Sequence, residues 1–174
     1  MELKYDKELN NIIKKFVKPF GCKVKMDTDF AYYPEQKLLT WSPFVMNKSD
    51  RYFNEYVQEN YPDIEADIFL WSLLHEVGHH MTYNIWSDDE FENAEKIKLW
   101  AETQLHEKLV TPTQERLCYL MYFSTCDEEQ ATKWAADYMD SHFERVEKFW
   151  KEFVDAYDIF LSENAIIKDD NRED

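Results

Sequence analysis

Residues 63–83 read DIEADIFLWSLLHEVGHHMTY, and the middle of this stretch is apolar on nearly every side of a helix. A helix that is hydrophobic all round belongs in the interior of a protein. The stretch is therefore predicted to form a central buried helix that the other elements surround. HEVGHH, at residues 75–80, lies inside it, which places histidines and a glutamate at or near the core.

The composition predicts one α+β domain that is rich in helix. The chain has 174 residues, of which 44% are hydrophobic and 17% aromatic, with only two glycines and five prolines. A chain of this length buries roughly two-thirds of its unfolded surface, so it can build a sizeable core. We expect a single domain over residues 1–167 and a disordered polar tail, KDDNRED, over residues 168–174.

A small β-hairpin is expected near the N-terminus. In CKVKMDTD, residues 22–29, apolar side chains alternate with lysines, and KLLTW at 37–41 is a second apolar run. FAYYPEQ, between them, supplies a turn that contains a proline. Helices are predicted from about residue 50, from the capping sequence Thr111, Pro112 and Gln114, and from residue 127 to about 161 with a bend near Ser141.

The charge and the cysteines restrict the partners and the compartment. The formal net charge of −16 repels phosphate backbones and anionic lipid, so nucleic acid and membrane are not expected as partners. The first twenty residues show an amphipathic pattern without a secretory signal, which predicts a cytoplasmic protein. Cys22, Cys118 and Cys126 lack CxxC spacing, so neither a disulfide framework nor a thiolate zinc site is indicated. The sequence does not indicate the oligomeric state.

HEVGHH has the spacing of a metal site. Each residue of a helix turns about 100°, so His75 and His79 lie about 40° apart, one turn along the same face. Both imidazoles can reach one ion, whereas His80 is turned about 140° from His75 and is expected on the surface or behind the ligands. Glu76 flanks the pair, near enough to hold a water without binding the metal itself. This is the HExxH arrangement of zinc hydrolases.

A catalytic zinc site takes three protein ligands, so one more is expected downstream. On a helical wheel of residues 127–140, Glu128 falls inside an apolar arc, and a carboxylate there needs a positive partner. A zinc ion would supply one, so Glu128 is the preferred third ligand. Glu129, Glu102 and His106 remain as rivals. The small side chains on this helix, together with Gly78 on the first, should let the two helices approach closely.

These residues resemble a known group. HEVGHH followed by ExxAxxxA, with Glu128, Ala131 and Ala135, is similar to the Glu-ligand zincin metallopeptidases, and in particular to the small intracellular ImmA/IrrE-like family, whose pattern is HExGH followed by ExxAN-x-FA. Thr132 stands where that family has Asn or Asp. The resemblance implies a zincin-like domain in which His75, His79 and Glu128 bind zinc, Glu76 is the general base, and a sheet edge over the cleft holds an extended peptide by strand addition.

The expected function is that of a zinc-dependent metallopeptidase acting on a peptide or protein substrate. Tyr83, one turn beyond His79, is the nearest candidate for a donor to the oxyanion, and a packed aromatic side chain is the alternative for it. One rival function is an idle binding or inhibitor module that keeps the metal and captures a protein. Another is a structural zinc, for which His106 is the one residue that could close a site of four ligands.

Overall fold

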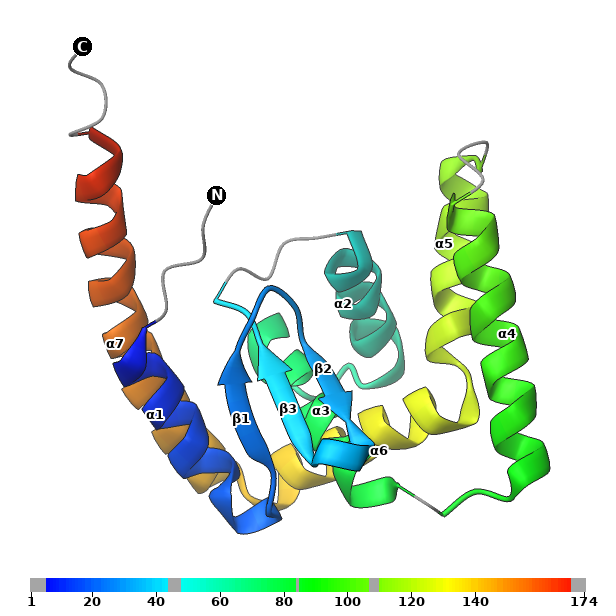
Figure 1. The fold of residues 1–174 in the computed structure, drawn as a ribbon, viewed down its shortest axis with the longest axis horizontal. Coiled ribbons are helices and arrows are strands. Elements are labelled where there is room, and N and C mark those ends of the chain that lie inside the picture. Colours follow the sequence, from blue (N-terminus) through cyan, green and yellow to red (C-terminus); the bar gives the residue numbers. More distant parts are fainter. Residues whose placement is uncertain (1–5, 44–47, 84, 107–109, 170–174) are drawn as a thin grey trace.

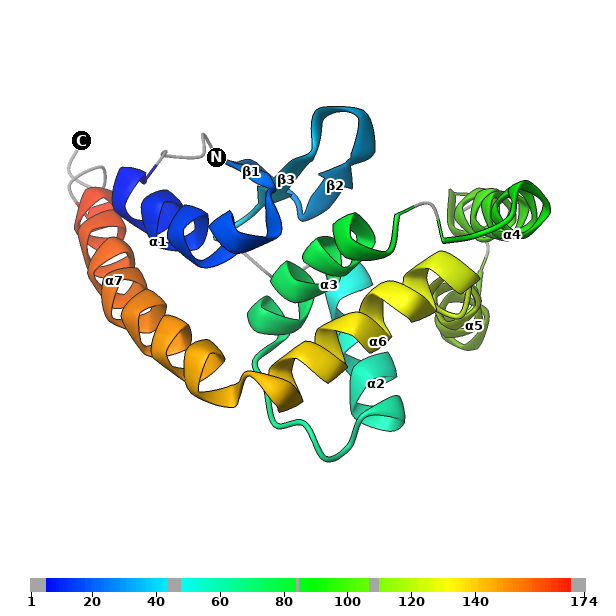
Figure 2. The ribbon, with the colours of Figure 1, turned by 90° about the horizontal axis from the view of Figure 1, so that it is seen from below.

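The computed structural model describes residues 6–43, 48–83, 85–106 and 110–169, with side chains as far as residue 162. Its architecture confirms the predicted class: an α+β domain, rich in helix, with a small mixed sheet near the N-terminus (Figures 1 and 2). The elements, in chain order, are α1 (Lys7–Val17), η1 (Lys18–Phe20), β1 (Lys23–Met26), β2 (Ala31–Tyr33), η2 (Pro34–Gln36), β3 (Leu38–Trp41), α2 (Lys48–Asn60), α3 (Ile68–Thr82), α4 (Asp88–His106), α5 (Pro112–Phe123), α6 (Cys126–Ser141) and α7 (Phe143–Asp169).

The sheet differs from the predicted hairpin. Its strand order is β1-β3-β2, and β1 pairs with β3 in parallel, so the two apolar runs are not joined by a hairpin turn. The hairpin instead joins β2 to β3, with Ala31 opposite Thr40 and Tyr33 opposite Leu38. The sequence places residues 31–33 in the turn, because so short an edge strand shows no alternation of buried and exposed side chains. The true turn is η2, after which Lys37 takes a left-handed conformation with φ 48°.

Helix α3 is the buried central helix that the sequence predicts. It starts at Ile68, later than Asp63, because the carboxylate of Asp67 accepts a hydrogen bond from the backbone N–H of Phe69 and so caps the first turn. Most of its residues are buried, including Leu73, Leu74 and Val77. The motif residues therefore lie on a helix that is held from several sides.

Helices α3 and α6 lie side by side, and among the described helices they share the most extensive contact (Figure 2). A Cβ atom added at Gly78 would lie 2.3 Å from the carbonyl oxygen of Ala131, so only glycine fits at this crossing. Ala131 and Ala135 are fully buried on the facing side of α6. The expected close approach of the two helices is thus present, and backbone meets backbone there.

The predicted helix starts are also found. Thr111 and Gln114 form the reciprocal capping box at the start of α5. The long helical run breaks at His142, next to the predicted bend, into α6 and α7. Helix α7 packs along α1 and continues to Asp169, while residues 170–174 of the expected tail lie outside the described residues (Figure 1). In the described part of the chain, no helix has both the length and the apolar character needed to cross a bilayer.

Candidate metal centre

The two motif histidines meet on one face of α3. The Nε2 atoms of His75 and His79 are 3.0 Å apart, as the four-residue spacing predicts. Both rings line a cavity of about 720 Å³, which also takes in residues of β2, α4 and α6. His75 is 5% exposed and His79 is half-buried, so the pair lies at the inner wall of this cavity.

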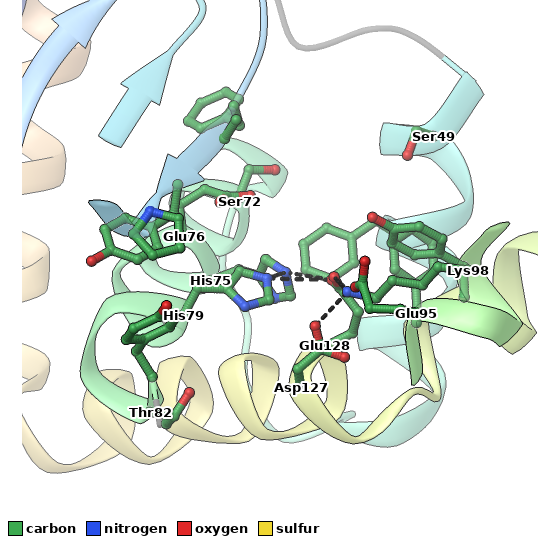
Figure 3. A pocket seen from close by; sticks show the side chains of 18 of the residues that line it. Ser49, Ser72, His75, Glu76, His79, Thr82, Glu95, Lys98, Asp127 and Glu128 are labelled. Atoms are coloured by element: carbon green, nitrogen blue, oxygen red, sulfur yellow. Dashed lines mark hydrogen bonds and ion pairs between the residues drawn. The ribbon is translucent and has the colours of Figure 1, made fainter. Parts of the chain in front are cut away.

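Glu128 of α6 completes a three-residue cluster. Its Oε2 atom lies 3.0 Å from Nε2 of His75 and 3.4 Å from Nε2 of His79 (Figure 3). One ligand atom from each of the three residues falls within a span of 4.8 Å. Glu128 is 5% exposed, and it comes to the histidines because α3 and α6 cross so closely.

The rival ligands lie elsewhere. Glu129 points away from the apolar arc and is exposed, and Glu102 and His106 are exposed on α4. Among the described residues, the group of His, Cys, Asp and Glu side chains close enough to share an ion consists of His75, His79 and Glu128. His106 therefore does not close a site of four ligands.

Thr132 sets the tautomer of His75. The Thr132 hydroxyl donates its hydrogen to the backbone carbonyl of Glu128 at 2.8 Å, so its oxygen can only accept from Nδ1 of His75, 3.0 Å away. Nδ1 of His75 is therefore the donor in this contact, which leaves Nε2, the ring nitrogen nearest Glu128 and His79, as the atom that a metal would bind. Such a partner behind a histidine is what a metal ligand requires. Sequence reasoning noted Thr132 only as a departure from the family pattern.

Lys98 of α4 also contacts the cluster, and the sequence did not predict it there. Its ammonium donates to Oε1 of Glu128 at 2.6 Å and also to Oδ2 of Asp127. The side chain is 13% exposed and its nitrogen lies 5.2 Å from the centroid of the Tyr122 ring. A signal was present: Ala94 and Ala101, both buried, place Lys98 on the inward stripe of its helix.

The charged groups of the cluster shift one another's pKa values. Burial lowers the pKa of His79, but the carboxylate of Glu128 outweighs it and raises that pKa to about 9. Burial raises the pKa of Glu128, yet His79 and His75 together hold it well below its usual range. Burial is also the main cause that raises the pKa of Glu76. The carboxylate of Glu128 is thus ionised and available as a ligand.

Glu76 and Tyr83 both line the cavity, but Tyr83 is more exposed to solvent than Glu76. Glu76 follows His75 directly and is half-buried at the cavity wall. Tyr83 caps the C-terminal end of α3, is 50% exposed and lies at the rim of the cavity. Its role as an oxyanion donor stays a prediction.

His80 does not join the cluster, in agreement with its angle on the helix. Its Nε2–H donates to the carbonyl of Phe20 at 3.0 Å, so its Nδ1 accepts from the hydroxyl of Tyr32 at 2.6 Å. Tyr32 belongs to β2, the edge strand, and Phe20 ends η1. His80 therefore fastens the sheet to α3 and holds β2 beside the cavity.

The donor set fits a zinc ion. Two imidazole nitrogens and one carboxylate oxygen are the ligand types of catalytic zinc, and a site of three protein ligands leaves a position for water or substrate. The fixed tautomer of His75 and the convergence of the three donor atoms supply what such an ion needs without rearrangement of the backbone.

Comparisons with known proteins identify no relative: no family model, no curated protein and no solved structure matches this chain.

Proposed function

We propose that this protein is a zinc-dependent metallopeptidase in which His75, His79 and Glu128 bind the ion and Glu76 is the general base. The observation that carries the proposal is the convergence of three ligand atoms within 4.8 Å on the wall of a cavity that Glu76 also lines. Buried polar side chains usually hydrogen-bond to one another, so their proximity alone does not indicate a metal site. In this cluster, however, Thr132 also fixes the tautomer of His75, and one side of the cluster faces the cavity.

The residues of the chain divide the work among them. When bound, zinc supplies Lewis acidity toward a water molecule and toward a carbonyl oxygen. Glu76 takes a proton from the water at its carboxylate and returns it to the leaving amine. Thr132 holds His75 in the binding tautomer. Tyr83, at the rim, is proposed to donate a hydrogen bond to the oxygen that becomes negative.

The proposed substrate is a peptide or an unfolded segment of a protein. The edge strand β2 contributes Ala31 and Tyr32 to the cavity, and an exposed strand edge can bind an extended peptide through backbone hydrogen bonds. A volume of about 720 Å³ suits a few residues of such a peptide. Nucleic acid and membrane are not proposed as partners, given the net charge of −16.

We also propose a cytoplasmic location. All three cysteines are free in the structure, as a reducing compartment favours.

One observation favours an idle binding module as a second function. Lys98 already neutralises Glu128, so the cluster is chemically satisfied by the chain alone. Such a cluster holds its shape without substrate turnover, as a module that binds a metal and a protein partner requires. An intact HExxH glutamate, Glu76, favours the enzyme.

The two functions are separated by comparing the native protein with Glu76→Gln over a broad peptide library, with bound zinc measured for both. The enzyme predicts equal zinc content and cleavage by the native protein only. Zinc in both proteins with no cleavage by either would favour the binding module, and cleavage by both would show that Glu76 is not the base.

A further inference from the structure

Lys98 and the proposed zinc ion would share one carboxylate. Oε1 of Glu128 accepts from the ammonium of Lys98 at 2.6 Å, while Oε2 of the same group lies 3.0 Å from Nε2 of His75 (Figure 3). The two oxygens therefore face two different positive partners. Any cation at the histidines would lie within a few ångströms of the ammonium.

The ammonium is held firmly where it is. Asp127 accepts a second hydrogen bond from it, and the ring of Tyr122 lies on another side. The side chain of Lys98 is largely buried, as are those of Glu128 and Asp127. One cation and two carboxylates thus lie together at the cavity wall, largely buried, where water screens their charges less than it does at the surface.

We propose that Lys98 is a built-in competing cation that sets the metal affinity of the site: it neutralises Glu128 in the metal-free protein and opposes the entry of a divalent ion. This inference rests on the proposed function, because it takes His75, His79 and Glu128 as the ligands. Two consequences follow, one for binding and one for folding.

The first consequence concerns affinity. Two positive charges this close repel, and a carboxylate that already accepts from an ammonium attracts a second cation less strongly. A neutral side chain at position 98 removes both effects. Zinc should therefore bind more tightly when the lysine is replaced, whereas loss of a merely structural residue would loosen the site.

The second consequence concerns the metal-free state. With Lys98 present, the buried charge of Glu128 is paired, so the native chain should fold without zinc. Without the lysine, Glu128 and Asp127 lose their shared ammonium, and zinc becomes the cation that replaces it. Stability should then depend more strongly on zinc.

The test measures zinc affinity by chelator competition and the melting temperature with and without zinc, for the native protein and for Lys98→Met. The expected result is zinc binding roughly ten-fold tighter in Lys98→Met, because the repulsion between the two cations is gone, with a larger rise in melting temperature when zinc is added. Lys98→Arg keeps the charge and should behave like the native protein. Lys98→Gln keeps a hydrogen-bond donor but not the charge, and should tighten zinc binding as Lys98→Met does.

Lys96→Met is the matched control. Lys96 lies on the same helix, half a turn away, and pairs with Glu92 on the exposed surface, so its loss should leave zinc affinity unchanged. Unchanged or weaker zinc binding in Lys98→Met and Lys98→Gln would overturn the inference while leaving the metallopeptidase proposal intact. Absence of zinc binding by the native protein would instead overturn the proposed function itself.

Discussion

The cluster draws on two regions that are built in opposite ways. Helices α3 and α6 meet backbone to backbone at Gly78, and they supply all three proposed ligands. Helix α4 stands further out with α5 (Figure 1), and it exposes the apolar side chains of Phe91, Leu99 and Trp100 to solvent. It nevertheless reaches the cluster with one long side chain, Lys98. The contrast indicates that the α3–α6 contact fixes the positions of the three proposed ligands, whereas α4 adds a positive charge beside Glu128.

The largest effect is expected from Gly78→Ala, which tests the close contact between α3 and α6. The added Cβ would lie 2.3 Å from a backbone oxygen of α6, which cannot move aside as a flexible side chain would. We expect a loss of about 3 kcal/mol in the free energy of unfolding, measured with urea. Gly21→Ala is the comparison, because Gly21 has φ 86° but a Cβ added there would meet its nearest neighbour, Nε2 of His80, at an ordinary 4.0 Å, and it should cost about 1 kcal/mol. Equal effects would show that α3 and α6 are not in contact at Gly78.

The next largest effect separates the third ligand from its neighbour. Glu128→Ala removes a proposed ligand and should weaken zinc binding by roughly 100-fold, whereas Glu129→Ala alters an exposed carboxylate and should change it little. Chelator competition on both variants measures the difference. Similar losses in the two would refute the choice of Glu128.

A smaller loss of zinc affinity is expected from a change at Thr132, which contacts Nδ1 of His75. Thr132→Val keeps the volume of a fully buried side chain but removes the oxygen that accepts from Nδ1 of His75. Zinc affinity should fall roughly ten-fold and the free energy of unfolding by about 1 kcal/mol. Thr132→Ser restores the hydroxyl and should recover the zinc affinity. If it recovers none, the tautomer of His75 is not set by this contact.

The smallest effect is predicted on the outer face of α4. Leu99 follows Lys98 but points to solvent. Leu99→Ala should change stability by less than about 0.5 kcal/mol and leave zinc affinity as it is. A large change in zinc affinity would mean that α4 influences the centre through more than Lys98.

Much of the helical architecture could be read from the sequence, because it depends on local chemistry. The all-apolar run of α3, the capping box of α5 and the break near Ser141 are each encoded within a few residues. The sheet could not be read in the same way. Strand β1 pairs with β3, and the strand between them in the chain, β2, lies at the edge of the sheet. Strand β2 has three residues, and their burial shows no period of two that could reveal a strand in the sequence.

The candidate ligands were also accessible from spacing, but their electrostatic setting was not. His75 and His79 follow from a helical period, and Glu128 from its place in an apolar arc. A buried carboxylate needs a cation, but its position in the sequence does not say which one, and Lys98 already provides one. Only the packing of α4 on α6 brings that lysine within reach. The position of Oε2 against two imidazole nitrogens is what still favours a metal.

The most direct test of the account is the zinc stoichiometry of the folded native protein and of a His75→Ala, His79→Ala double variant, after removal of metal and titration with zinc. The account predicts one zinc ion per native chain and none at the same concentrations for the double variant. A native protein that binds no stoichiometric zinc, or a double variant that binds it as well as the native protein, would contradict the claim that α3 and α6 hold a metal between them.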